Sequence, residues 1–354
     1  PEADLSDVNI TRIRPLNETE LLVATEGMGV YKLDMNKCIL ERYISANYQS
    51  YNEMNGDNIN DVFVDESKRI WLANYPTGIT VIDYRYENYH WMKHSMGNKQ
   101  SIVNDQVHAV IEDSDGDLWF GTSNGISLYN SGTGEWHSFL SSFNHQLKDK
   151  NHIFITLCEV SPGIIWAGGY TSGIYKINKA DLSVEYFSPY LLSHINMRPD
   201  KYIRDMIKDS KGHIWSGGYY NLKCFDLATN SVRLYPGVSS ITAIAEKDSH
   251  NMWIGTAMGL YLLNRDSGKY EYIKLEAGST YINTLYQADN GLLYVGTNGA
   301  GVFIYDAQNK KFEHYIAKNS ALVSNSIFTI LPEVDGRIMM STENGVTSFH
   351  TKEK

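Results

Sequence analysis

The stretch "GDLWFGTSNGISLYN", Gly116 to Asn130, contains two apolar runs separated by a Gly-Thr-x-x-Gly break. Nearly the same pattern recurs in "HNMWIGTAMGLYLLN", which ends at Asn264, and in "NGLLYVGTNGAGVFIYD", which ends at Asp306. Short runs rich in β-branched and aromatic residues, joined by turn residues, predict antiparallel strands. The recurrence therefore indicates a fold built from copies of one small β-unit.

Eight copies of this unit can be aligned along the chain by the apolar residue that anchors the second strand of each. Successive anchors are 38 to 49 residues apart. This period matches propeller blades of about 40–50 residues and not helical repeats of about 33–34 residues. The anchors are Leu22, Trp71, Trp119, Trp166, Trp215, Trp253, Tyr294 and Met339.

Each unit contains four apolar runs. In the third unit they are "VHAVIED" (Val107 to Asp113), "LWFGT", "ISLYN" and "EWHSF", with the turn "SDGD" after the first. Glycine in the Gly-Thr break permits a tight reversal between the second and third strands because it tolerates positive φ. One small sheet is only marginally stable in water, whereas sheets packed face to face around an axis bury both faces. We therefore predict an all-β protein, a β-propeller of four-stranded antiparallel blades.

Two ways of closing the ring remain open. The chain begins with a first strand at Ile10 and ends after a third strand, "GVTSFH" (Gly345 to His350), so the last unit lacks its outer strand. Either eight blades close with one incomplete blade, or seven close with "CILERY" (Cys38 to Tyr43) as the missing strand. In the second case residues 1–37 end a preceding propeller and residues 38–354 form the ring. We slightly prefer a seven-bladed ring.

Bulk properties exclude several classes of function. The net charge of −10, with no run rich in Lys or Arg, argues against nucleic-acid binding. Cys38, Cys158 and Cys224 are far apart and fit neither a zinc site nor a disulfide framework. There is no apolar run of about 18 residues that could span a membrane, and the first four residues do not resemble a signal peptide. We expect a mature or excised soluble segment without a cofactor.

The motifs that suggest chemistry have simpler explanations as turns. "DSDGD" (Asp113 to Asp117) resembles the start of a calcium loop, and "GTNGAG" (Gly296 to Gly301) contains several glycines, as phosphate-binding loops do. Both stretches lie between predicted strands, where turns are expected. No sequence typical of a serine hydrolase, a zinc protease or a P-loop is present. An aspartate precedes the anchor in five units, where it is expected to shape a turn: Asp65, Asp113, Asp209, Asp248 and Asp289.

Tyrosines mark one face of the predicted ring. In a propeller the turns between second and third strands share a face with the connections between blades. Three of these turns carry tyrosine, in "ANYPTG" (73–78), "GGYTSG" (168–173) and "GGYYNL" (217–222). Long loops on a rigid scaffold often carry binding sites, and four long connections, residues 45–58, 95–106, 142–152 and 188–202, belong to this face. The candidate ligand-binding tyrosines are Tyr75, Tyr170, Tyr219 and Tyr220.

Polar residues are predicted at the mouth of the axial channel, where the first strands begin on the same face. Exposed aromatic rings beside amide, carboxylate and guanidinium groups suit a polar ligand with apolar ring faces, such as a sugar. Alternatively, the tyrosines dock a neighbouring domain or pack the loops, and Arg204 and Asp205 pair with neighbouring blades. The candidate ligand-binding residues here are Asn60, Asp61, His108, Arg204 and Asp205.

The repeats resemble those of a known family. "DSDGDLWFGTSNGISLYN", "DSKGHIWSGGYYNLKCFDL" and "DSHNMWIGTAMGLYLLN" are similar to the two-component regulator propeller repeat, roughly D-x-x-G-x-[IL]-W-[IF]-G-T-x-x-G-[IL]-x-x-[FY]-[DN]. The resemblance extends from about Ile10 to His350. It is weaker where Leu22, Tyr294 and Met339 replace the anchor tryptophan. Two units have Gly-Gly-Tyr in place of the Gly-Thr start, which suggests a specialised turn.

The resemblance implies the periplasmic sensor region of a bacterial hybrid two-component system. In that family two seven-bladed propellers, which tend to share strands, precede an immunoglobulin-like domain, a membrane helix, a histidine kinase and a response regulator. The usual signals are oligosaccharides. The implied function is a non-catalytic sensor that binds an oligosaccharide or a partner propeller, in a receptor expected to be a homodimer. This chain lacks the kinase motifs, so any kinase activity lies outside it.

Two other functions remain as alternatives. A propeller lyase or hydrolase acting on polysaccharides would need a base and an acid in one pocket, and the candidates are His108 with Asp61 or Arg204 with Asp205. A pure protein-interaction ring would use the tyrosine-bearing face as a docking surface.

Overall fold

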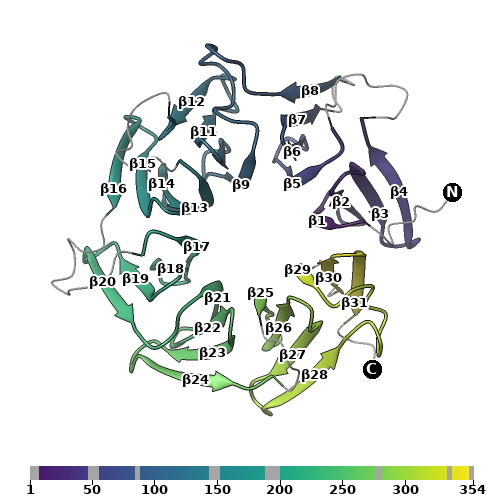
Figure 1. Cartoon of the computed structure of the whole chain (residues 1–354), viewed down its shortest axis with the longest axis vertical. Coiled ribbons are helices and arrows are strands. Elements are labelled where there is room, and N and C mark those ends of the chain that lie inside the picture. The colour runs from purple at the N-terminus through teal and green to yellow at the C-terminus, as the bar shows by residue number, and fades with distance from the viewer. Residues whose placement is uncertain are drawn as a thin grey trace.

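The computed structural model shows eight antiparallel sheets arranged as the blades of a ring (Figure 1). It describes residues 8–46, 56–83, 88–142, 152–187, 200–275, 281–332 and 337–350. Strands pair in chain order within each blade, and the first strand of each blade lies nearest the axis in Figure 1. The predicted all-β propeller with eight repeats is confirmed. In the described ranges no helix has the length and apolarity needed to cross a membrane.

Seven blades have four strands and the eighth has three. Blades 1 to 4 consist of β1 (Ile10–Pro15), β2 (Glu20–Thr25), β3 (Val30–Asp34), β4 (Ile39–Ile44); β5 (Ile59–Val64), β6 (Ile70–Asn74), β7 (Gly78–Asp83), β8 (Asn88–Met92); β9 (Val107–Glu112), β10 (Leu118–Thr122), β11 (Gly125–Tyr129), β12 (Trp136–Phe139); and β13 (Phe154–Ser161), β14 (Ile164–Gly169), β15 (Ile174–Asn178), β16 (Ser183–Phe187).

The other four blades follow the same order around the ring. They consist of β17 (Ile203–Lys208), β18 (Ile214–Gly218), β19 (Leu222–Asp226), β20 (Ser231–Tyr235); β21 (Ile241–Asp248), β22 (Asn251–Thr256), β23 (Gly259–Asn264), β24 (Lys269–Ile273); β25 (Ile282–Gln287), β26 (Leu292–Thr297), β27 (Val302–Asp306), β28 (Lys311–Tyr315); and β29 (Ile327–Pro332), β30 (Arg337–Thr342), β31 (Gly345–His350).

The ring closes between blade 8 and blade 1, so the preference for seven blades was wrong. Met339 is fully buried in one apolar cluster with Ile10 and Leu21. Arg337 donates a hydrogen bond from Nη1 to the carbonyl oxygen of Met35 at 3.0 Å. The "CILERY" stretch forms β4, which pairs with β3 of its own blade. Because the turn between β3 and β4 is short, closing this hairpin costs little loop entropy, which favours it over pairing with a distant strand.

The hydrophobic core lies between neighbouring blades, and the anchors of the repeats are at its centre. Trp119 is fully buried with Ile126 and Phe139 of its own blade and with Leu157 and Ile165 of blade 4. Equivalent clusters bury the other tryptophan anchors and Tyr294. Each blade therefore stabilises the next, and the sheets are held in a rigid wheel.

The two glycines of the Gly-Thr-x-x-Gly break have different roles. A Cβ on Gly121 would lie 2.8 Å from the carbonyl oxygen of Phe154, so this glycine lets the first strand of blade 4 approach. Gly125 has the positive φ, 103°, that reverses the chain. Thr122 closes the turn by donating a hydrogen bond from Oγ1 to the carbonyl oxygen of Gly125 at 2.8 Å. The positive φ therefore belongs to the second glycine of the break.

Candidate ligand-binding site

The predicted tyrosines lie in the turns between second and third strands and are solvent-exposed. Tyr75 follows β6, Tyr170 follows β14, and Tyr219 and Tyr220 follow β18. Between 40% and 52% of each residue is accessible. Tyr75 belongs to blade 2 and shares no ring contact with the other three tyrosines in the described part of the chain. The structure therefore groups the tyrosines of blades 4 and 5 and leaves Tyr75 apart.

Three tyrosine rings form a continuous row over blades 4 and 5. The ring of Tyr202 stacks on that of Tyr219, with centroids 4.3 Å apart and an interplanar angle of 27°. It meets the ring of Tyr170 edge-on at 5.3 Å. We call Tyr170, Tyr202 and Tyr219 the aromatic row. Tyr202 was missed as a candidate, although its place immediately before β17, at the end of a long connection, was a usable signal.

The Gly-Gly-Tyr sequence of blade 5 makes room for this row. A Cβ on Gly218 would clash with the carbonyl oxygen of Tyr202 and lie 3.1 Å from a carboxylate oxygen of Asp200. Asp200 accepts hydrogen bonds from the amides of Tyr220, at 2.8 Å, and Tyr202, at 3.3 Å. Loss of the usual threonine thus lets the Asp200–Tyr202 segment pack on the turn and fixes the row in place.

A buried lysine lies beneath the turn of blade 5. The side chain of Lys223 is 2% exposed, and its ammonium is 3.8 Å from Asp200 and 3.4 Å from the carbonyl oxygen of Asn221. Burial lowers the pKa of Lys223, although the neighbouring carboxylate of Asp200 opposes the shift. A buried charge needs a partner, so this pair ties the Asp200–Tyr202 segment to β19.

A ring of bulged residues surrounds the axis of the wheel. Each first strand has a register shift next to its first residue, which leaves one unpaired residue per blade. Thr242 donates a hydrogen bond to the carbonyl oxygen of Ile282 at 2.6 Å, and Thr11 and Asn283 make equivalent bonds to the next blade. The eight bulged residues are Thr11, Asn60, His108, Ile155, Arg204, Thr242, Asn283 and Phe328.

Asp61, one of the predicted ligand-binding residues, instead forms ion pairs between blades. It is buried and forms a two-pronged ion pair with Arg12, at 2.9 and 3.3 Å, while Arg14 lies 3.8 Å away. Asn60 is half-buried at the bulge directly before it. Asp61 therefore joins blades 1 and 2 and has little capacity left for a ligand.

His108 occupies the bulge of blade 3 and is exposed at the channel. Its Nε2 lies 2.7 Å from the hydroxyl oxygen of Ser123 in the turn of the same blade. The pKa of His108 is lowered because the surrounding protein partly desolvates the charged ring. No hydrogen bond joins His108 to Asp61 in the ranges that the structure describes.

Arg204 and Asp205 have different environments. A carboxylate oxygen of Asp205 accepts a hydrogen bond from the amide of Ile244 in blade 6 at 2.9 Å. Burial raises the pKa of Asp205, which favours the neutral acid. Arg204 is exposed, and none of the hydrogen bonds and ion pairs among the described residues involves its guanidinium. Among the predicted residues near the axis, Arg204 is thus an exposed cation without an ion-pair partner in the described part of the chain.

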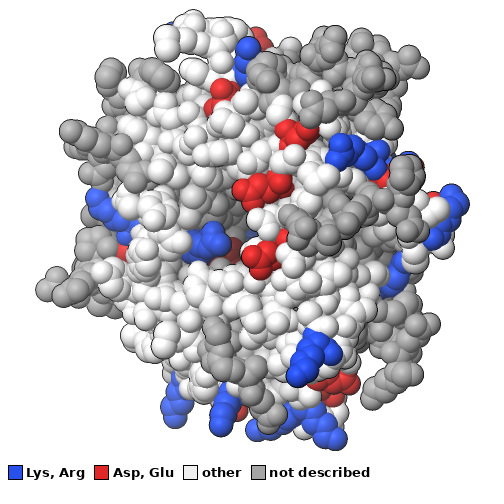
Figure 2. All heavy atoms as spheres, turned by 45° about the vertical axis from the view of Figure 1, so that its right-hand side comes forward, with Lys and Arg blue, Asp and Glu red and all other residues white. Residues whose placement is uncertain are grey.

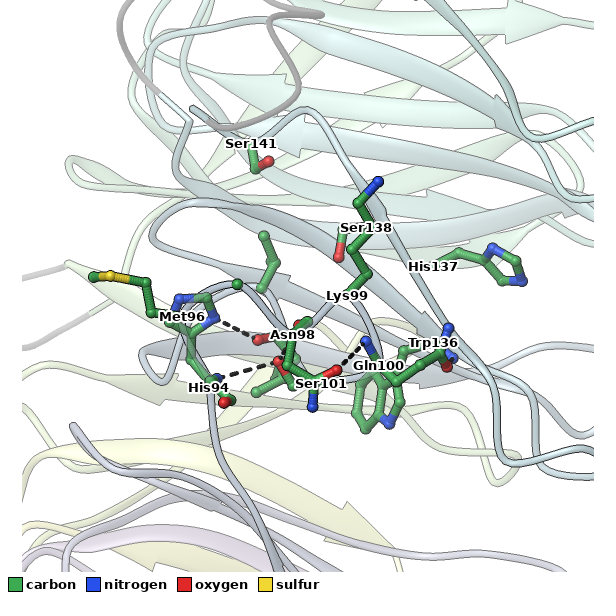
Figure 3. A pocket seen from close by; sticks show the side chains of 14 residues that line it. His94, Met96, Asn98, Lys99, Gln100, Ser101, Trp136, His137, Ser138 and Ser141 are labelled. Carbon is green, nitrogen blue, oxygen red and sulfur yellow. Dashed lines mark hydrogen bonds between the residues drawn. The ribbon is translucent and has the colours of Figure 1, made fainter.

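A separate hollow lies at the outer rim of blade 3, where the connection 95–106 folds over β12 (Figure 3). Its volume is about 690 Å³. Gln100 points towards Trp136 and accepts a hydrogen bond from its amide at 2.9 Å, whereas Met96 points away at the opposite end. The other long connections, 45–58, 142–152 and 188–202, lie largely outside the described residues.

The face seen in Figure 2 carries charged side chains as separate groups on a mostly uncharged surface. Among the residues that are not grey, no continuous basic patch is visible on it. This distribution does not favour a polyanion that spreads over the whole face, and it leaves recognition to individual side chains.

The family model described as two component regulator propeller matches residues 101–124. The chain carries a two-component regulator propeller repeat. This match confirms the resemblance found in the opening stretch. No curated protein matches the chain significantly.

Solved structures with similar folds include sensor regions, a designed protein and an enzyme. The extracellular domain of the putative hybrid two component system BT3049 from B. thetaiotaomicron is 19% identical, with a TM-score of 0.59, over 98% of this chain and 52% of that one. The computationally designed Ika8 protein is 12% identical, with a TM-score of 0.69, over 97% and 96%. Virginiamycin B lyase from Staphylococcus aureus is 12% identical, with a TM-score of 0.57, over 81% and 92%.

At these identities the similarities show a propeller fold and no more. The chain spans about half the length of the BT3049 extracellular domain. Neither the sensor role nor the lyase activity follows from the fold alone.

Proposed function

We propose that this chain is a non-catalytic sensor propeller of a hybrid two-component system, located outside the cytoplasm, and that its aromatic row binds an oligosaccharide. The observation that carries the proposal is the ordered row itself. A stacked pair and an edge-on pair of tyrosines, next to turns that Asp200 holds in place, form a partly exposed aromatic surface over blades 4 and 5. Sugar rings have apolar faces and polar edges that match such a surface.

Rigidity of the row supports a binding role. Tyr202 is held between two other rings, so little side-chain entropy would be lost when a ligand stacks on them. Tyr170 and Tyr219 are 44% and 52% exposed, so their rings are accessible. The row therefore combines order with accessibility.

Signal relay in this proposal depends on further domains. An oligosaccharide that contacts this ring and an adjoining propeller would shift their relative orientation through its different affinities for the two arrangements. In this proposal the chain is part of a periplasmic, homodimeric receptor. That receptor also contains an immunoglobulin-like domain and a kinase, both outside this chain. The matching propeller repeat at residues 101–124 supports this assignment to two-component signalling.

Calorimetric titration of the protein with neutral and acidic oligosaccharides tests the proposal. Replacement of Tyr170 and Tyr219 by alanine is expected to weaken binding by about tenfold or more, because a buried aromatic contact contributes about 1–3 kcal/mol. Tyr272→Ala is the matched control, since Tyr272 is 48% exposed but lies on the outer strand β24. Equal loss in both variants, or none, would remove the aromatic row as the site.

The enzyme alternative is not favoured by the geometry of its candidate pairs. Asp61 is bound to Arg12, and the observed partner of His108 is Ser123. Asp205 accepts a hydrogen bond from a backbone amide of blade 6. Release of unsaturated products or new reducing ends from polysaccharides would reverse this conclusion. A pure protein-interaction ring predicts instead a tight partner domain and no oligosaccharide binding.

A further inference from the structure

We propose that Arg204 recognises an anionic group, a carboxylate or a sulfate, on the oligosaccharide that the aromatic row binds. This inference rests on the proposed function and narrows it to acidic oligosaccharides. It begins with the bulge of blade 5, which places an exposed arginine on the strand nearest the axis.

The arginines of the first strands differ in how their charge is compensated. On β1, Arg12 forms the two-pronged pair with Asp61 and Arg14 lies 3.8 Å from the same carboxylate. Arg204 on β17 has no carboxylate within ion-pair distance in the described part of the chain. An arginine that only stabilised the ring would be expected to resemble Arg12. Arg204 instead keeps its donors free.

In the described part of the chain, the bulge positions on either side of Arg204 do not supply a carboxylate. The adjacent bulge positions are occupied by Ile155 in blade 4 and Thr242 in blade 6, and the hydroxyl of Thr242 is bonded to the carbonyl oxygen of Ile282. The charge of Arg204 acts on the carboxylate of Asp205, the next residue, and lowers its pKa against the larger effect of burial. The two side chains form no ion pair, and one oxygen of Asp205 is bonded to the amide of Ile244. The guanidinium therefore has one carboxylate nearby, beyond ion-pair distance, and no hydrogen-bond partner among the described residues.

Arg204 is also close to the aromatic row. Burial raises the pKa of the Tyr202 phenol, and the positive charge of Arg204 acts on it in the opposite direction. Arg204 follows Tyr202 by two residues, at the bulge near the start of β17. A guanidinium binds carboxylate or sulfate oxygens with two parallel hydrogen bonds. One ligand could thus stack on the row and place its anionic group on Arg204.

The test compares neutral and acidic oligosaccharides of equal length on an array and then by calorimetry, for example galactose oligomers against galacturonic acid oligomers and their sulfated forms. We expect at least one acidic member to bind the protein about tenfold more tightly than its neutral counterpart. In Arg204→Gln the affinity for the acidic member should fall to that of the neutral one. Lys208→Gln is the matched control, because it removes a positive charge from the far end of the same strand. Higher salt should weaken the binding of the acidic member only.

The outcomes separate this inference from the proposed function. Neutral members that bind as tightly as acidic ones, or an acidic member whose affinity is unchanged in Arg204→Gln, would overturn the role of Arg204 and leave the aromatic row intact. An equal loss in Lys208→Gln would show a general effect of charge and would also overturn it. Absence of binding by every member would reject the sensor site and this inference together.

Discussion

At the scale of single residues, one aspartate in the repeat both shapes the turn and accepts a hydrogen bond from the anchor tryptophan. Asp113 accepts turn amides from Asp115 and Asp117 at 3.0 Å, and its other oxygen accepts the indole N–H of Trp119 at 2.8 Å. The same indole bond joins Trp71 to Asp65 and Trp215 to Asp209. The sequence predicts the turn, because aspartate before glycine is ordinary turn chemistry. It does not reveal the bond to the anchor, which needs the first two strands to be paired.

Removal of Asp113 should therefore destabilise the ring more than its place in a surface turn suggests. Asp113→Ala leaves the buried indole N–H of Trp119 without a partner, and such a loss costs about 1–3 kcal/mol. The measurement is the free energy of unfolding in urea. Asp115→Ala is the control, since the Asp115 side chain is 66% exposed although it also contacts Lys179. Similar stability of the two variants would argue against the indole bond.

The same carboxylate predicts a dependence of stability on pH. Burial alone would raise the pKa of Asp113, but hydrogen bonds from Lys179 and Trp119 outweigh it and hold the pKa below its ordinary value. The stabilisation is therefore present above the ordinary pKa, about 4, and is lost as the pH falls through the lower folded value. Urea unfolding between pH 7 and pH 3 should show the stability gap between the protein and Asp113→Ala shrinking below about pH 4. A gap that stays constant would contradict this assignment.

At the scale of elements, the turns between second and third strands show what a repeat pattern can and cannot predict. The repeat pattern showed that Gly217-Gly218-Tyr219 replaces the usual Gly-Thr start of the turn, and it correctly predicted exposed tyrosines there. The reason for the departure lies in the Asp200–Tyr202 segment, which occupies the space that a threonine would fill. That segment precedes the blade and shares no motif with the turn, so only the packed structure brings Tyr202 into the aromatic row.

Restoring the usual side chain at this turn should dismantle the row. Gly218→Thr would force the new Cβ into the carbonyl of Tyr202, so the Asp200–Tyr202 segment must move and oligosaccharide binding should fall about tenfold or more. The change would also be visible as a loss of near-ultraviolet circular dichroism from the ordered tyrosines. Gly132→Ala is the control, because a Cβ there would meet only Asn130 at an ordinary 3.5 Å. A Gly218→Thr protein with intact binding would show that the row tolerates displacement.

At the scale of the whole molecule, the number of repeats was predictable and the closure was not. The spacing of the anchors gave eight units, but pairing of the last blade with the first depends on contacts between residues that are more than 300 positions apart. Two neighbouring methionines of β30 pack on opposite sides of blade 8. Met340 packs in the cluster shared with Ile304 of blade 7, and Met339 packs in the cluster shared with Ile10 of blade 1.

A closed ring predicts that both methionines contribute to stability, because a blade packs on each side of blade 8. Met339→Ala and Met340→Ala should each lower the free energy of unfolding by about 2–5 kcal/mol, the usual cost of truncating a fully buried methionine. In an open row of blades, no blade would cover Met339, and only Met340→Ala would be costly. Equilibrium unfolding of the two variants measures the difference directly. A cost for Met339→Ala below about 0.5 kcal/mol would mean that blade 8 does not close on blade 1 in solution, since substitutions at uncovered positions rarely cost more.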